Sequence, residues 1–260
     1  MSKLFLTVFY LFLLCSVNGQ QFLTVSDALK DKRDYNFISE YQKGYLNDLY
    51  VTKVNISDEL INGREYIPYY LKCKVKPLLF DGRKRSGSLL FNGRRYDNLK
   101  LEYDIYLDQL IYSDSSKFID DKLFKIALNK DPVDGFSLYF GSDSMIFRHF
   151  RTNVAVKANL PEGFYEVVYD GKSKCIIRHQ SFLLEEDGEY EYRYTPSEYV
   201  MVGESFSKVH SSRGFIKLFG KDSDVVRKFM RTNKVRFGRA DKNEVAAVLR
   251  YYDTQVMSNK

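Results

Sequence analysis

The chain has 260 residues, with 40 Lys and Arg against 34 Asp and Glu, which gives a formal net charge of +6. It is 44% hydrophobic and 16% aromatic, with 21 Tyr and 20 Phe but no Trp, 3 His and 3 Cys. This composition excludes a disordered or collagen-like chain, a disulfide-dense scaffold and a Cys/His zinc module. A chain of this length forms one large domain or two small ones and can bury a core without metals.

The first nineteen residues are typical of a secretory signal peptide. Lys3 supplies the positive start, Leu4–Cys15 form a short apolar run, and Val17–Gly19 resemble a cleavage site before Gln20. That run is too short to span a bilayer, and no later segment reaches about 18 consecutive apolar residues. We therefore predict an exported protein, periplasmic or secreted, that is cleaved after Gly19 and has no transmembrane segment after the signal peptide.

Two cysteines follow the signal peptide, Cys73 and Cys175, in a compartment that permits disulfides. A bridge between them would close a loop of about 100 residues and contribute roughly 4–5 kcal/mol on the chain-entropy model. The alternative is two buried free thiols, because Cys is among the most buried residue types. The sequence leaves both alternatives open.

The rest of the chain divides into three segments by pattern. Residues 20–60 have weak, mixed periodicity and are interpreted as an extended or partly helical lead-in. Residues 61–215 contain short strands separated by turn signals every eight to twelve residues, which predicts an antiparallel β domain. Residues 216–260 form a basic, helical C-terminal segment. The expected fold is α+β, mainly antiparallel, with a curved sheet or open barrel-like arrangement and two C-terminal helices.

The strongest strand signal lies between residues 88 and 112. Asn92-Gly93 predicts a two-residue hairpin, because both central positions of a type I′ turn need positive φ. Asp97-Asn98 resembles a second tight turn. From Leu99 onward apolar and polar residues alternate, which predicts a half-buried strand. Its apolar face would contain Leu99, Leu101, Tyr103, Ile105 and Leu107, and its polar face Lys100, Glu102, Asp104 and Asp108.

The helical period begins after residue 215. Asp222 or Ser223 is suited to cap a first helix whose apolar face contains Val225, Val226, Phe229 and Met230. Asp241–Glu244 is a capping-box pattern before a second helix with Val245, Ala246, Val248, Leu249 and Tyr252.

The positive charge belongs to this C-terminal segment. Residues 206–260 hold 13 Lys and Arg against 5 Asp and Glu, a net of +8, whereas residues 20–205 hold 26 against 29, a net of −3. A basic cluster of this kind binds an anionic surface, a phosphate group or an acidic partner protein, unless it is simply a solvated helix face. Because we expect export, nucleic acid is not an expected partner. The candidate binding residues are Arg227, Lys228, Arg231, Lys234, Arg236, Arg239 and Lys242.

Residues 87–105, from Gly-Ser-Leu-Leu-Phe-Asn-Gly to Tyr-Asp-Ile, resemble a pattern of exported envelope proteins of Gram-negative bacteria. That pattern is a Gly-initiated hairpin, a Tyr and then an alternating strand with Tyr-Asp-Ile. The segments Asn62–Tyr66, Gly163–Gly171 and Leu249–Asp253 are similar to it as well. The resemblance implies an uncharacterised family with a basic helical C-terminus. Its motifs are structural, so it implies no functional residue.

The sequence contains no nucleophile elbow, nucleotide-binding glycine loop, HExxH helix or kinase motif. His149, His179 and His210 lie about thirty residues apart, a spacing that could bring them together on a sheet. We expect ordinary structural roles instead, because His149 and His179 each follow an Arg, which disfavours a metal ion beside them. No catalytic residue, metal site or cofactor is predicted.

Three functions remain as hypotheses. The favoured one is a non-enzymatic envelope protein, a binding or scaffolding module that meets an envelope protein or anionic surface through a sheet edge or the basic segment. The second is a hydrolase of an envelope or extracellular polymer, which requires a deep cleft lined by His or paired carboxylates. The third is binding of anionic lipid or polyanion through residues 227–242. The sequence does not determine the oligomeric state.

Overall fold

The structure, a computed structural model, describes residues 63–257 except 69–72, 74, 120–121, 187 and 238–240. The predicted signal peptide (1–19) and lead-in (20–60) lie outside the described residues, and so does Arg239. Of the helices that are described, none combines the length and the apolar character needed to cross a bilayer.

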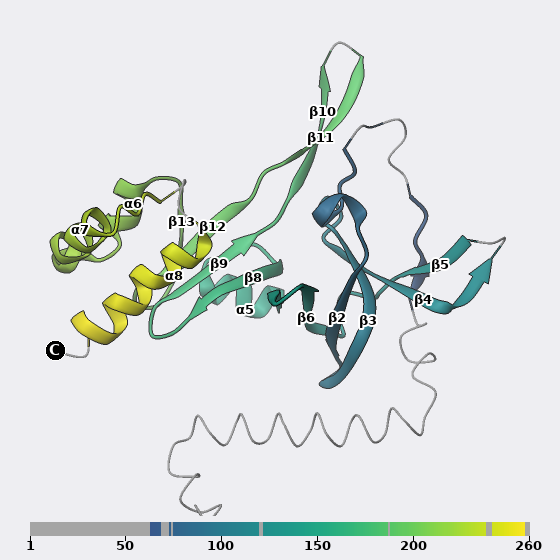
Figure 1. The fold of residues 1–260 in the computed structure, drawn as a ribbon, viewed down its shortest axis with the longest axis horizontal. Coiled ribbons are helices and arrows are strands. Elements are labelled where there is room, and N and C mark those ends of the chain that lie inside the picture. Colours follow the sequence, from purple (N-terminus) through teal and green to yellow (C-terminus); the bar gives the residue numbers. More distant parts are fainter. Residues whose placement is uncertain are drawn as a thin grey trace, which may run out of the picture. The chain divides into compact units, whose positions relative to one another are not determined.

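Most of the described chain forms one large open sheet in which neighbouring strands are antiparallel (Figure 1). Its order is β1-β5-β4-β3-β2-β6-β7-β8-β9-β12-β13, and β10 and β11 form a separate two-stranded sheet. The predicted α+β class, with mainly antiparallel strands in a curved, unclosed sheet, is confirmed. The strands are β1 (Arg64–Glu65), β2 (Arg85–Phe91), β3 (Arg94–Asp104), β4 (Gln109–Ile119), β5 (Lys122–Ala127), β6 (Val133–Phe140), β7 (Asp143–Phe150), β8 (Gly163–Asp170), β9 (Lys174–Arg178), β10 (Ser181–Glu186), β11 (Glu189–Tyr194), β12 (Ser197–Met201) and β13 (Phe206–Val209).

The turn at Asn92-Gly93 joins β2 and β3 as predicted, with φ values of 51° and 72°. The second predicted turn, Asp97-Asn98, is wrong, because β3 runs through it without interruption. Asn98 has a φ of 58°, and the register between β2 and β3 shifts between Gly87 and Leu89. The left-handed conformation that suits Asn in a turn is used here for a β-bulge.

Two carboxylates that were expected on the polar face of β3 are buried. Glu102 meets Lys125 of β5, whose Nζ lies 2.7 Å from Oε2. Asp104 accepts hydrogen bonds from the Tyr66 hydroxyl and from the N–H groups of Tyr106 and Leu107. These two carboxylates are buried because residues distant in the sequence cover this face and supply hydrogen-bond donors. A turn begins at Ile105, so the strand is also shorter than the alternation predicted.

Aromatic rings form much of the main core. Phe136 and Phe147 are cross-strand partners on β6 and β7 and stack with centroids 4.5 Å apart. Tyr103 contacts both rings edge to face, and Phe164 of β8 contacts Tyr103 and Phe136 in the same way. Such pairs stabilise a sheet by roughly 0.2–1 kcal/mol each. The aromatic content of the chain is therefore largely structural.

The helices are α5 (Thr152–Ala158), α6 (Ser212–Lys217), α7 (Ser223–Thr232) and α8 (Lys242–Tyr251), together with the short turns η1 (Leu79–Gly82), η2 (Gly220–Asp222) and η3 (Tyr252–Val256). The two predicted C-terminal helices are confirmed as α7 and α8. Asp241 caps α8 through the N–H of Asn243, whereas the Asp222 carboxylate accepts a hydrogen bond from the Tyr252 hydroxyl and does not cap α7. The short helices α5 and α6 were not predicted, because six or seven residues give too short a window for helical periodicity.

The C-terminal helices build a second core on the sheet. Their apolar side chains close over β9, β12 and β13, and this cluster includes Cys175, Val200, Val209, Val226, Met230, Val245, Val248 and Leu249. In Figure 1 the helix α8 is drawn beside β8, β9 and β12, and direct contacts link it to β8 and β9.

Carboxylates hold both ends of the α8–η3 segment against the sheet. At the start of α8, Lys242 Nζ lies 2.5 Å from Glu166 Oε1 on β8. After its end, the buried Asp253 accepts hydrogen bonds from the N–H and hydroxyl of Ser173 and from the Tyr169 hydroxyl. Gly171 permits this approach, because a Cβ at that position would collide with Tyr169 and Asp253. The turn between β8 and β9 is thereby joined to the C-terminal segment.

We expect Asp253→Ala to lower the free energy of unfolding by about 2–4 kcal/mol, because the buried donors of Ser173 and Tyr169 lose their acceptor. Urea denaturation followed by circular dichroism measures the change. Thr254→Ala, at an exposed neighbouring position, is the control and should change the value by less than about 0.5 kcal/mol. Equal losses for the two variants would contradict the assigned role of Asp253.

Candidate functional site

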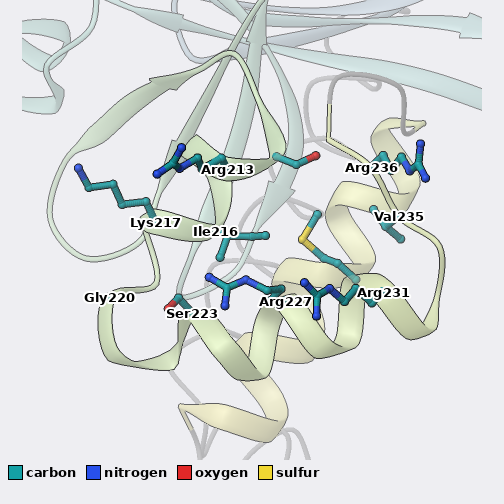
Figure 2. Close-up of a pocket in the computed structure, with 11 residues that line it drawn as sticks. Arg213, Ile216, Lys217, Gly220, Ser223, Arg227, Arg231, Val235 and Arg236 are labelled. Carbon is teal, nitrogen blue, oxygen red and sulfur yellow. The ribbon is translucent and has the colours of Figure 1, made fainter.

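A cationic pocket lies among the elements that precede α8. It has a volume of about 740 Å³ and is lined by α6, η2, α7 and the segment that follows α7. Among the described lining residues five are basic and none is acidic, and in Figure 2 Lys217 and Arg236 extend to opposite sides of the pocket. These five residues, which we call the pocket cations, are Arg213, Lys217, Arg227, Arg231 and Arg236.

Four of these cations form two pairs, and the members of each pair lie on the same face of one helix. Arg213 and Lys217 are four residues apart on α6, and Arg227 and Arg231 are four residues apart on α7. Residues at this spacing share one face of a helix. In Figure 2, Arg227 and Arg231 extend from α7 on the same side as Ile216 of α6.

The structure separates the seven residues that the sequence had grouped. Arg227, Arg231 and Arg236 line the pocket, whereas Lys228 and Lys234 are exposed and do not line it. Lys242 is paired with Glu166, and Arg239 lies outside the described residues. Sequence reasoning missed Arg213 and Lys217, which precede the dense basic run. Their i, i+4 spacing was the available signal, but it lies on a helix that was not predicted.

Few of the pocket cations have a carboxylate partner among the residues that the structure describes. Arg227 pairs with Asp224, one turn earlier on α7. Within the part of the chain that the structure describes, no carboxylate pairs with Arg213, Lys217, Arg231 or Arg236. Like charges gathered at one hollow repel one another, and an anion placed among them relieves that repulsion.

The floor of the pocket is apolar. Ile216, Met230 and Val235 line it, and Met230 belongs to the core beneath the helices. Ser212 and Ser223 add hydroxyl groups that can donate or accept hydrogen bonds. A lining with apolar, hydroxyl and cationic groups suits a ligand that carries both an anionic group and an apolar or aromatic part.

A buried polar network lies beside the start of α8. His179 Nε2 donates to Glu166 Oε2 at 2.9 Å, because a carboxylate only accepts, and Nδ1 lies 2.6 Å from the Tyr194 hydroxyl. Burial would raise the pKa of Glu166, but the hydrogen bonds from His179 and Lys242 outweigh it and lower that pKa. The network links β8, the residue that follows β9, β11 and α8, and acts as a structural anchor.

Glu198 of β12 is opposite Ile177 of β9, which is itself opposite Glu166 of β8. Its Oε2 is buried without a hydrogen-bond partner among the described residues, and burial raises its pKa. The two carboxylates therefore have pKa values shifted in opposite directions, because only Glu166 has cationic and hydrogen-bonding partners.

Both cysteines are free thiols in the structure. Cys175 is enclosed by the C-terminal helices, and burial together with Glu198 and Glu166 raises its pKa to about 12. Cys73 lies in a different environment, close enough to Tyr192 to affect the pKa of that phenol. The two thiols are unbridged in the structure, but only Cys175 is buried, whereas Cys73 is partly exposed.

The three histidines do not form a common site. His149 contacts the Val133 carbonyl, His179 belongs to the buried network and His210 is exposed. Over the described ranges, no group of three His, Cys, Asp or Glu side chains is arranged to hold a metal ion. Among the described residues that line the cationic pocket there is neither a His nor a carboxylate.

Comparison with family models, with curated proteins and with solved structures finds no match to this chain. The resemblance to exported envelope proteins therefore stays a prediction.

We expect Glu166→Gln to destabilise the fold by about 1–3 kcal/mol at pH 7, because His179 and Lys242 lose their anionic acceptor. The pKa of Glu166 is lower in the folded chain, so the carboxylate stabilises the fold above pH 4.5, its ordinary value. The difference from wild type should shrink as the pH falls below 4.5. Urea denaturation at several pH values tests this, and a pH-independent difference would contradict it.

Glu198→Gln should have the opposite effect. Because the folded chain raises the pKa of Glu198, ionisation at neutral pH favours the unfolded chain. A neutral Gln of similar shape removes that penalty, so the free energy of unfolding should rise at pH 7 and match wild type below pH 4.5. The same denaturation series measures both variants. A loss of stability at pH 7 would show that Glu198 is held by a favourable interaction.

Proposed function

We propose that this chain is a binding protein whose C-terminal segment holds an anionic ligand in the cationic pocket. The observation that carries the proposal is a hollow of about 740 Å³ with five basic residues, four of which have no carboxylate partner among the described residues. The proposal is a form of the third sequence hypothesis, the binding of anionic lipid or polyanion through residues 227–242, and the basic lining of the pocket supports it. The favoured hypothesis, an exported binding or scaffolding module of the envelope, is compatible with it.

The packing of α7 favours capture in a pocket over insertion of a helix into a membrane surface. An interfacial helix must place its apolar face among lipids. In α7 that face is already used, because Val226 and Met230 are buried in the core beneath the helices. Its basic face remains outside and contributes Arg227 and Arg231 to the pocket. Attraction between the pocket and an anion is therefore the expected mode of binding.

The ligand class follows from the lining. Arginine guanidinium groups bind carboxylate and phosphate oxygens in a paired geometry, and four of the five pocket cations are Arg. The apolar floor adds a contact that inorganic anions cannot use. We propose a ligand with several carboxylate or phosphate groups and an apolar or aromatic portion.

Isothermal titration with inositol hexakisphosphate at low ionic strength tests the pocket with a defined polyanion. We expect Arg213→Glu combined with Arg231→Glu to weaken binding at least about tenfold, equivalent to about 1.4 kcal/mol. Added salt should weaken wild-type binding, because exposed charges are screened over about 8–10 Å.

The control is Lys228→Glu combined with Lys234→Glu. It makes the same change in net charge at exposed residues of the same segment that do not line the pocket. This variant should bind within about threefold of wild type. Equal losses in the two variants would indicate diffuse attraction to the basic segment and would reject the pocket as the site.

A further inference from the structure

The β10–β11 hairpin is acidic and forms a two-stranded sheet separate from the large sheet. Residues 181–194 contain five Asp and Glu and one Arg. The last pair of β9 and β12 is Arg178 with Ser197, and the first pair of the hairpin is Ser181 with Tyr194. The hairpin therefore continues the direction of the β9–β12 pair, but it forms a sheet of its own (Figure 1). Two-stranded ribbons are marginally stable in water unless another surface packs on them.

Large apolar side chains of the hairpin remain exposed. Phe182, Leu183, Tyr190 and Tyr194 have between 40% and 52% of their surface in solvent. They lie on both faces of the ribbon, since Phe182 is opposite Arg193 whereas Leu183 is opposite Tyr192. Tyr192, by contrast, is well buried and contacts Tyr106. The ribbon therefore presents apolar and acidic groups that the rest of the described chain does not cover.

The carboxylates of the hairpin are as poorly neutralised as the pocket cations. Glu186 pairs with Arg193 at 3.4 Å within the hairpin. In the described part of the chain, Glu185, Glu189 and Glu191 have no cationic partner, and Glu189 lies directly opposite Glu186. Like charges at opposite positions destabilise a ribbon, and a cationic surface against them would remove that cost.

The two surfaces complement each other in both charge and apolar character. The pocket offers five cations above an apolar floor, and the hairpin offers carboxylates beside Tyr190, Phe182 and Leu183. Among the described residues no ion pair joins them within one chain, so both remain open to another molecule. A pocket of this volume is large enough for several side chains of a ribbon tip.

We propose that the β10–β11 hairpin of one copy binds in the cationic pocket of a second copy, so that the chain associates with itself. This inference rests on the proposed function, because the hairpin is then the anionic and aromatic ligand of the pocket. Each copy carries both surfaces. A reciprocal exchange closes a dimer, and a one-way contact continues into a chain of copies. Contacts dominated by exposed charges depend strongly on ionic strength.

Two charge-reversal variants test the proposal, and sedimentation velocity over a range of protein concentrations measures their association. The hairpin variant carries Glu185→Lys, Glu189→Lys and Glu191→Lys, and the pocket variant carries Arg213→Glu, Arg231→Glu and Arg236→Glu. All six positions are exposed, and circular dichroism checks that both variants remain folded. Wild type should associate at low salt and dissociate as salt is added. Each variant alone should stay monomeric, because like charges then face each other.

An equimolar mixture of the two variants should associate again, because every hairpin then meets a pocket of opposite charge. The control Lys228→Glu with Lys234→Glu should associate as wild type does. A mixture that stays monomeric overturns the proposal, and so does wild-type association that neither variant alters. Monomeric wild type that still binds inositol hexakisphosphate in its pocket overturns the self-association alone. If inositol hexakisphosphate binds the Arg213→Glu, Arg231→Glu variant as tightly as wild type, the proposed function is rejected instead.

Discussion

The attachment of α8 to the sheet is the constraint on which the C-terminal half of the structure depends. Apolar packing beneath the helices supplies most of the driving force, but it is not directional. The contact of Lys242 with Glu166 and the hydrogen bonds of Asp253 to Ser173 are directional and involve charged groups. They define where α8 begins and ends on the sheet. The helices α6 and α7, which form the cationic pocket, precede α8 in the chain. The position of α8 on the sheet therefore also limits where α6 and α7 can lie.

The same network shows how a buried charge is tolerated in this fold. Glu166 is surrounded by His179 and Lys242, and its pKa is lowered in spite of burial. Glu198, two strands away, is half-buried, its Oε2 has no hydrogen-bond partner among the described residues, and burial raises its pKa. Hydrogen bonds and a nearby cation therefore decide the sign of the shift, because desolvation acts on both carboxylates in the same direction.

Basic and acidic side chains form two separate clusters on the surface, and few of their charges are paired with an opposite charge. The pocket cations gather on α6, α7 and the segment after it, whereas carboxylates gather on the β10–β11 hairpin. Each cluster repels itself in an isolated chain and lowers the stability of the folded state. Binding of an oppositely charged surface removes that cost. The relief of this repulsion is the physical basis of both proposals.

Patterns within a short stretch of sequence were sufficient for the fold class, the Asn92-Gly93 turn and the helices α7 and α8. These depend on local backbone preference and on periodicity, which a linear sequence displays directly. The same information named Arg227, Arg231 and Arg236 as candidate binding residues, and these three line the cationic pocket. Tertiary contacts decided the rest, because they join residues far apart in the chain. They buried Glu102 and Asp104, engaged Lys242 with Glu166 and brought Arg213 and Lys217 to the pocket from a helix too short to be predicted.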